Sequence, residues 1–252
     1  MTNKFFRIPN LLVAFMKIIS KIISFIFPIT CSCCGKDLSA SYGGRICPDC
    51  LLALPKIEGF ICKKCGFPLK DGGEHCRKCL KKPFEITADA MRSVYLYKDG
   101  ARKLILKFKY SDKLFLAKDL GAQMADKFKE LPFYEETDCL IPIPLNIIRR
   151  IKRGYNQAEL LSREISKLSG KPVFSKILYR KKMTKPQFKL SKEERFNNLK
   201  NSFFVKNEPQ IHKKTVLLID DIITTGATIS ACASALKKHG AKKVYALSFA
   251  RD

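Results

Sequence analysis

A short stretch near the C-terminus constrains the fold of this 252-residue chain more than any other part of the sequence. It covers residues 216–228 (VLLIDDIITTGAT), and a helix-like segment follows over residues 229–239. A short apolar run that ends at a turn is typical of a strand buried on both faces of a parallel sheet. The stretch therefore predicts an α/β domain built on a parallel sheet, with Asp220 and Asp221 at the end of a strand.

The residues after the two carboxylates form a candidate phosphate site. In open parallel sheets, ligands bind beyond the carboxyl ends of the strands. Free backbone N–H groups at a helix start bind anions, and Gly226 lets the backbone approach closely. Paired carboxylates at a strand end are costly unless they meet a partner, which also favours a ligand site. The alternative is an ordinary strand-to-helix turn in which Asp221 or Thr224 caps the helix.

This stretch resembles the signature of type I phosphoribosyltransferases, which bind PRPP (5-phosphoribosyl-1-pyrophosphate). In that family two acidic residues hold the ribose hydroxyls, and a Thr-Thr-Gly-x-Thr loop wraps the 5′-phosphate. Carried over by position, the resemblance implies that Asp220 and Asp221 bind ribose. It implies that the phosphate is bound by Thr224, Thr225, Gly226, Ala227 and Thr228. It also implies a type I phosphoribosyltransferase-like parallel sheet flanked by helices, and Mg²⁺ bound together with PRPP.

Eight of the eleven cysteines form four Cys-x-x-Cys pairs. Two thiolates around a tight turn can face one ion, and four thiolates make a closed tetrahedral zinc site without an open position for catalysis. We therefore expect two structural zinc ions in a small double zinc ribbon over residues 29–83. The expected ligands are Cys31, Cys34, Cys47, Cys50, Cys62, Cys65, Cys76 and Cys79. Sequential pairing is the simplest arrangement, while an interleaved one, or Cys33 in place of Cys34, stays open.

The sequence also predicts the structure of the N-terminal 28 residues and the cellular compartment of the protein. Residues 11–27 are largely apolar, with lysines and serines at spacings of three and four that share one helical face. This segment is too short and too interrupted for a comfortable membrane span. It predicts an amphipathic helix docked on its own protein, with contact to a membrane surface as the alternative. Metal knuckles in place of disulfides favour a reducing compartment, so we expect a cytoplasmic protein.

A change in composition after Pro83 marks the expected start of the phosphoribosyltransferase domain, residues 84–252. Within it, hydrophobic periodicity predicts several helices and strands. The expected helices cover residues 100–110, 113–131, 158–168 and 229–239. The expected strands cover residues 88–97, 138–142, 202–205, 216–219 and 243–249.

A second motif, Arg153-Gly-Tyr-Asn-Gln-Ala, follows the expected strand 138–142 and a basic loop. Guanidinium groups bind phosphate oxygens bidentately, and the loop would lie at the same sheet edge as the phosphate site. The motif resembles the signature of the ComF family, a phosphoribosyltransferase-like group linked to natural competence and DNA uptake. The resemblance implies that Arg153 binds pyrophosphate, and that Asn156 and Gln157 orient the loop or an acceptor.

Residues 181–201 also resemble the ComF pattern, with Gln187 and Arg195 among the matching positions. In relatives this region is a mobile flap that closes on the substrate, and such a lid excludes water from the reaction. The alternative is a long exposed connection.

The net charge of +25 predicts a salt-sensitive attraction to polyanions, although many lysines are expected simply to face solvent. Two functions are expected as alternatives. The first, implied by the resemblance to phosphoribosyltransferases, is transfer of a phosphoribosyl group from PRPP with Mg²⁺. The second is binding of single-stranded DNA, with aromatic side chains stacking on bases; the candidates are Phe108, Tyr110, Phe188 and Phe196. The resemblance also implies a partner such as a competence helicase or another DNA-uptake protein.

Overall fold

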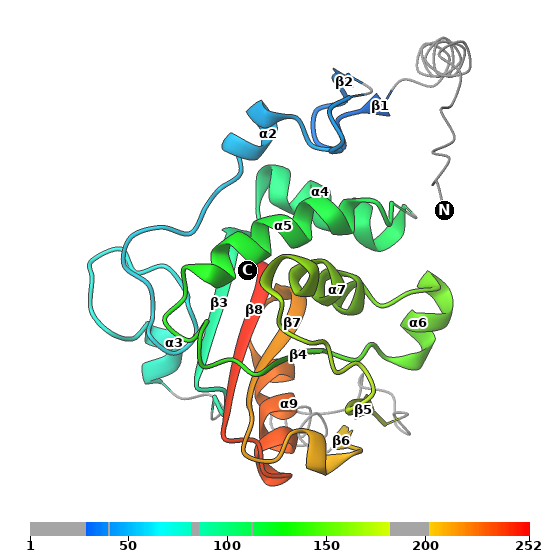
Figure 1. Cartoon of the computed structure of the whole chain (residues 1–252). Helices are drawn as coiled ribbons and strands as arrows, with labels where there is room; N and C mark the ends of the chain where they lie inside the picture. Colours follow the sequence, from blue (N-terminus) through cyan, green and yellow to red (C-terminus); the bar gives the residue numbers. More distant parts are fainter. Residues whose placement is uncertain (1–28, 40, 82–85, 112, 182–201) are drawn as a thin grey trace, which may run out of the picture. The chain divides into compact units, whose positions relative to one another are not determined.

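The computed structural model describes residues 29–39, 41–81, 86–111, 113–181 and 202–252 (Figure 1). The chain divides into two compact units, Met1–Leu52 and Ala53–Asp252. The expected helix over residues 11–27 and the expected flap residues Gln187 and Arg195 lie outside the described residues. Phe188 and Phe196 lie outside them as well.

A four-stranded parallel sheet forms the centre of the second unit. Its strands lie in the order β3 (Ala90–Leu96), β8 (Lys243–Arg251), β7 (Thr215–Ile223) and β4 (Cys139–Pro142). Residues 216–219 of β7 are fully buried, because helices cover both faces of the sheet. This explains why the run is continuously apolar rather than alternating. The predicted α/β fold with a parallel sheet is confirmed.

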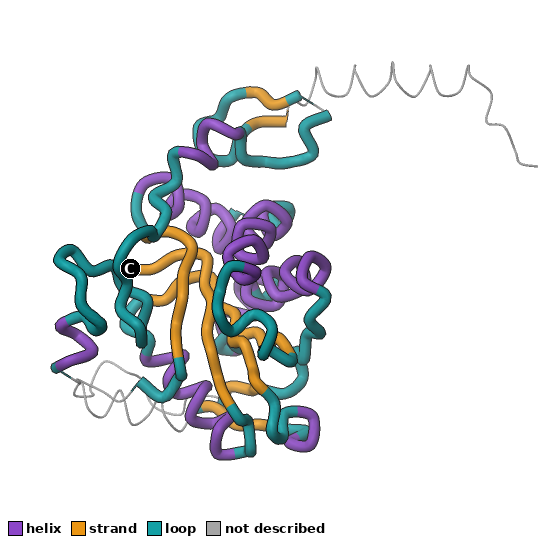
Figure 2. Tube along the Cα trace, turned by 60° about the vertical axis from the view of Figure 1, so that its left-hand side comes forward, coloured by secondary structure: helices purple, strands orange, loops and turns teal. Residues whose placement is uncertain are grey.

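Helices lie on both faces of this sheet (Figures 1 and 2). One face carries α4 (Asp99–Tyr110), α5 (Leu116–Lys129) and α7 (Gln157–Ser169). The other carries α9 (Ala227–Lys238), whose Cys232 and Leu236 share a buried core with Val216 and Leu218 of β7. The four helices predicted from periodicity are all present, with ends displaced by a few residues.

Two elements differ from the expectation. Strand β7 continues past both carboxylates to Ile223, because it keeps pairing with β8 as far as Arg251. The basic stretch expected as a loop is helix α6 (Ile147–Arg153). It begins where the Asn146 side chain accepts a hydrogen bond from the backbone N–H of Ile148 at 2.9 Å. It ends at Gly154, whose φ of 75° closes the helix.

A short hairpin adds to the second unit, formed by β5 (Leu178–Arg180) and β6 (Phe203–Val205), with a 3₁₀ turn at Glu208–Gln210 after it. Strand β6 was predicted and β5 was not. Within the described ranges, no helix is both long and apolar enough to cross a bilayer.

Each unit holds one cysteine cluster. The first contains the short strands β1 (Ile29–Thr30) and β2 (Asp37–Leu38) and helix α2 (Pro48–Leu52). The second cluster, with helix α3 (Arg77–Leu80), lies in the same compact unit as the parallel sheet. The domain division at residue 83 stays a sequence-based prediction.

Candidate functional site

The two adjacent carboxylates of β7 have a cationic partner that comes from helix α4. Asp221 is 6% exposed, and Asp220 is partly exposed. Lys109 Nζ lies 2.9 Å from Asp221 Oδ1, and both side chains are largely withdrawn from solvent. The backbone N–H of Asp221 donates to Asp220 Oδ1 at 2.8 Å. The pair is thus a fixed site for hydroxyl donors or a hard cation, since carboxylate oxygens accept from both.

The local environment favours the protonated form of one carboxyl. Withdrawal of Asp220 from solvent, together with the neighbouring charge of Asp221, raises the pKa of Asp220 to about 8. The N–H of Asp221 and the charge of Lys109 oppose this shift only in part. In the ligand-free protein the pair therefore carries less than two negative charges at neutral pH.

The start of helix α9 is left open for an anion. Its N-cap is Gly226 with a φ of 82°, a residue that has no side chain to cap the helix. The Thr225 hydroxyl accepts a long hydrogen bond from the N–H of Ala227 at 3.3 Å. Thr224 and Thr225 are exposed. The alternative expectation, a turn capped by Asp221 or Thr224, is therefore wrong, and the loop retains the donors that an anion requires.

The guanidinium of Arg153 is held at the end of α6 by two side chains. Its Nη2 donates to the hydroxyl of Tyr110 at 3.0 Å, and its Nη1 donates to Gln157 Oε1 at 3.2 Å. The guanidinium also lies 4.8 Å from the centre of the Tyr110 ring. Gln157 is almost fully buried, so it fixes the arginine from the protein side.

The other residues of the second motif attach it to the sheet and to α4. Asn156 caps helix α7 by accepting from the N–H of Ala158 at 3.1 Å, and its amide donates to the carbonyl of Ile143 at 3.1 Å. The Tyr155 hydroxyl donates to the carbonyl of Phe108. The motif is therefore a clamp between the end of β4, the start of α7 and the last turn of α4.

The helix over residues 100–110 was predicted, but the role of its last turn at this site was not. Its consecutive residues Phe108, Lys109 and Tyr110 contact Tyr155, Asp221 and Arg153 respectively. This turn brings the acidic pair and the Arg153 motif to one place. Lys109 could not be told from the other basic residues, since Lys and Arg together number 48. Phe108 is fully buried, so the expectation that it stacks on DNA bases is wrong, while Tyr110 is exposed.

Both cysteine clusters have the composition expected from the spacing. Cys31, Cys34, Cys47 and Cys50 form one, and Cys62, Cys65, Cys76 and Cys79 form the other. In each, the four sulfur atoms lie within 4.8 Å of one another. Sequential pairing is confirmed, and Cys33 is not a member.

The sulfur positions suit a tetrahedral metal. The Cys34–Cys47, Cys62–Cys79 and Cys65–Cys76 sulfur distances are 3.8, 3.7 and 3.6 Å. Zinc–sulfur bonds of about 2.3 Å in a tetrahedron require sulfur separations of about 3.8 Å. Burial tends to raise the pKa of Cys31, but backbone N–H groups outweigh it and lower that pKa to about 6. The thiolate form that zinc needs is therefore favoured at this ligand.

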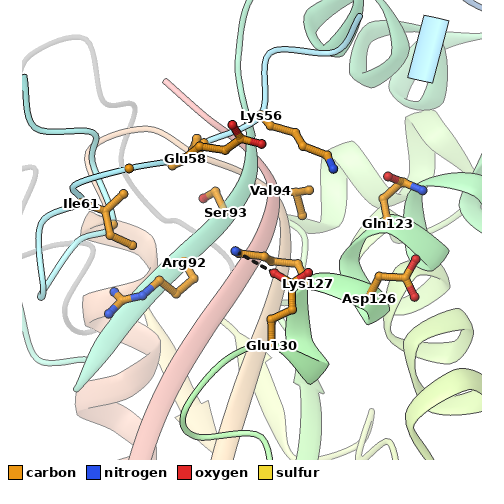
Figure 3. Close-up of a pocket in the computed structure, with 13 residues that line it drawn as sticks. Lys56, Glu58, Ile61, Arg92, Ser93, Val94, Gln123, Asp126, Lys127 and Glu130 are labelled. Atoms are coloured by element: carbon orange, nitrogen blue, oxygen red, sulfur yellow. Dashed lines mark hydrogen bonds and ion pairs between the residues drawn. The ribbon is translucent and has the colours of Figure 1, made fainter. Parts of the chain in front are cut away.

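A cavity of about 570 Å³ lies elsewhere in the second unit, between the segment around Lys56, strand β3 and helix α5 (Figure 3). None of residues 220–228 lines it. Its basic side chains are Lys56, Arg92 and Lys127, and its acidic ones are Glu58, Asp126 and Glu130. Lys127 and Glu130 pair at 3.0 Å. This balance of charge gives no preference for a polyanion or a cation.

Comparison with known proteins agrees with these observations. Residues 22–80 match the double zinc ribbon domain, and residues 91–252 match the phosphoribosyl transferase domain. The chain is 32% identical to Competence protein F of Haemophilus influenzae over 235 residues, covering 89% of this chain and 98% of that protein.

Two further relatives cover most of the chain. Competence protein ComFC of Bacillus subtilis is 29% identical over 200 residues, which are 78% of this chain and 79% of that protein. DNA utilization protein YhgH of Escherichia coli K12 is 28% identical over 220 residues, which are 86% of this chain and 94% of that protein. These relatives thus match most of the chain, and the chain, with its double zinc ribbon domain followed by a phosphoribosyltransferase domain, belongs to the family of Competence protein F and ComFC.

Proposed function

We propose that this protein binds PRPP together with Mg²⁺ and transfers the phosphoribosyl group to an acceptor. Asp220 and Asp221 accept hydrogen bonds from the ribose hydroxyls. The 5′-phosphate lies in the loop of residues 224–228, at the open start of α9. Arg153 binds the pyrophosphate. The observation that supports the proposal is the acidic pair of β7, with Asp221 buried against Lys109, beside a start of α9 whose N-cap is Gly226.

In the proposed reaction the bond between C1 of the ribose and the pyrophosphate oxygen breaks, and a bond from C1 to the acceptor forms. Positive charge develops on the sugar and negative charge on the departing pyrophosphate. The protein therefore needs mainly to position the groups and to stabilise charge. Asp220 and Asp221 stabilise the sugar, and Arg153 stabilises the leaving group. Mg²⁺ would add charge neutralisation at the phosphate oxygens, with the Asp220 and Asp221 carboxylates as the hard ligands available.

Isothermal titration with PRPP and Mg²⁺ tests the binding step. We expect the wild-type protein to bind, and Asp220→Asn/Asp221→Asn to lose at least tenfold in affinity, since each carboxylate would lose a charge-assisted hydrogen bond. A matched control is Glu58→Gln/Asp126→Asn, an acidic pair in the separate cavity of Figure 3. If the two double variants bound PRPP with equal affinity, the proposal would be contradicted.

A second candidate function is the binding of single-stranded DNA, favoured by a group of side chains on the β5–β6 hairpin. The Tyr179 and Phe204 rings stack with centres 5.5 Å apart. Lys206 Nζ lies 5.2 Å from the first ring centre and 5.9 Å from the second. Stacked rings beside a cation suit bases and phosphates, and the net charge of +25 adds long-range attraction.

Filter binding of a single-stranded oligonucleotide across a salt series tests this second function. We expect a steep fall of affinity with salt, and a loss of about tenfold in Tyr179→Ala/Phe204→Ala, since each stacked base is worth about 1–3 kcal/mol. A flat salt dependence, or unchanged binding by the double variant, would argue against it.

A further inference from the structure

The second cysteine cluster is built onto the edge of the parallel sheet. Strand β3 is an edge strand, and such strands expose unpaired backbone groups. The N–H of Met91 donates to the carbonyl of Lys64 at 2.8 Å, and the N–H of Ile57 donates to the carbonyl of Val94 at 3.0 Å. The N–H of Leu96 donates to Pro55 at 2.8 Å. The segment that leads into the cluster thus covers this edge.

The closest approach is at Gly66, the residue after the ligand Cys65. Gly66 has a φ of 69°, and a Cβ added there would overlap the carbonyl oxygen of Met91 and lie 3.3 Å from Arg92 Cα. Only a residue without a side chain lets the metal-binding turn pack directly on the backbone of Met91. Arg92 strengthens the attachment, because its Nη1 donates to the carbonyl of Lys63 at 3.0 Å.

The side chain of Met91 extends from this contact to the phosphate loop. A Cβ added at Gly226 would lie 3.1 Å from Met91 Sδ and 3.2 Å from its Cε. Met91 is fully buried and shares a core with Ile223 and Ile229, on either side of the loop. One residue therefore contacts the turn of the second cluster through its backbone and the start of α9 through its side chain.

A buried cation on the neighbouring strand β8 is consistent with a negative charge on the second cysteine cluster. Arg251 of β8 is 3% exposed, and within the described residues its Nε and Nη1 have no hydrogen-bond partner. Its guanidinium lies 6.0 Å from the ring centre of Phe67, two residues after Cys65. A zinc ion with four thiolates carries a net charge of about −2, which offsets a buried guanidinium.

We infer that the second zinc ribbon positions the phosphate loop, and that Met91 is the positioning residue through which it acts. The inference deepens the proposed function, since it takes residues 224–228 as the phosphate site. The two zinc sites then differ in role. The second site holds the edge of the sheet and, through Met91, the start of α9, whereas the first belongs to a separate compact unit.

Hydrogen exchange of the zinc-loaded full chain, followed over peptides that cover residues 222–232, tests this directly. We expect Met91→Ala to raise exchange in the loop by about tenfold or more while the chain still holds two zinc ions. Met91→Leu should restore most of the protection, because it refills the volume beside Gly226. Met124→Ala is the matched control, since Met124 is equally buried but lies on α5.

The cysteine clusters supply a second comparison that does not depend on Met91→Ala folding. Cys62→Ser/Cys65→Ser should raise exchange over residues 222–232, and Cys31→Ser/Cys34→Ser should raise it only over residues 31–50. Equal loop exchange in Met91→Ala and Met124→Ala, or in the two cysteine variants, would overturn the inference. The PRPP affinity is measured in parallel. If the wild-type protein binds no PRPP, the proposed function fails while the exchange comparison still decides the positioning role.

Discussion

At the scale of single residues, Lys109 is the contact that ties a helix to the acidic pair. It is 2.9 Å from Asp221, and the two side chains are 15% and 8% exposed. Removing one member of such a pair leaves a charge without compensation in a poorly solvated place. Lys109 therefore matters for folding before any ligand binds.

We predict that Lys109→Met lowers the free energy of unfolding by about 3 kcal/mol, measured by urea denaturation. Asp221→Asn in the same chain should recover part of this loss, because the unpaired charge disappears. Arg102→Met, at an exposed position of the same helix, is the control and should change stability little. Additive losses in the double variant would show that the two side chains do not interact.

The raised pKa of Asp220 predicts a dependence of stability on pH. The unfolded carboxyl releases its proton near its ordinary pKa of 3.8, whereas the folded one holds it up to about 8. Between these values the folded state binds more protons, so rising pH favours unfolding. Without PRPP and Mg²⁺, Asp220→Asn should gain stability over the wild type by about 1 kcal/mol per unit from pH 6 to 8. A constant difference would contradict the pKa.

Sequence reasoning reached the residues that lie in recognisable patterns and missed those that do not. The eight cysteines were grouped from their spacing. The acidic pair and the loop of residues 224–228 were singled out from their place after an apolar run and from the resemblance to phosphoribosyltransferases. Lys109 was missed because its partner is more than a hundred positions away in the sequence. Met91 was missed because a buried methionine in a strand is indistinguishable from ordinary core.

At the scale of elements, glycines determine where two helices begin or end. Gly226 starts α9 with a φ of 82°, and Gly154 ends α6 with a φ of 75°. Their surroundings differ. Met91 fills the space beside Gly226, while nothing lies within 4 Å of a Cβ added at Gly154.

Alanine substitutions at these two glycines therefore distinguish the cost of a left-handed backbone from the cost of a steric clash. We predict that Gly154→Ala costs about 1 kcal/mol of unfolding free energy, from the left-handed backbone alone. Gly226→Ala should cost about 2 kcal/mol or more, because Met91 must also move. Thermal denaturation of both variants checks this. If the two cost the same, Met91 does not restrict the loop.

The elements also show where pattern reasoning stopped. Strand β7 is longer than the apolar run of residues 216–219, because pairing with β8 keeps Asp220 and Asp221 within the strand. Helix α6 was expected as a loop because three arginines and a lysine follow the predicted strand 138–142. In the structure none of its residues is buried, and three of its seven are exposed isoleucines (Ile147, Ile148 and Ile151). Both errors arise where tertiary context overrides local composition.

At the scale of the whole molecule, the two zinc sites belong to different compact units. We predict that Cys62→Ser/Cys65→Ser lowers the main melting temperature by about 10 °C, since loss of a structural site removes several kcal/mol from the unit that contains the sheet. Cys31→Ser/Cys34→Ser should leave that transition nearly unchanged. Calorimetry with metal analysis of each variant checks this, and equal shifts would contradict the assignment of the second site to the sheet.

The hairpin of β5 and β6 has a consequence for how the chain tolerates change. Arg180 and Phe203 are paired residues of antiparallel strands, so their Cα atoms lie about 5 Å apart. The chain that links these two residues has its ends fixed by this pairing. The entropy cost of bringing those ends together changes only slowly with the length of the chain between them. Lengthening the chain between these two residues should therefore change the free energy of unfolding little, by about 0.6 kcal/mol for each doubling of that length.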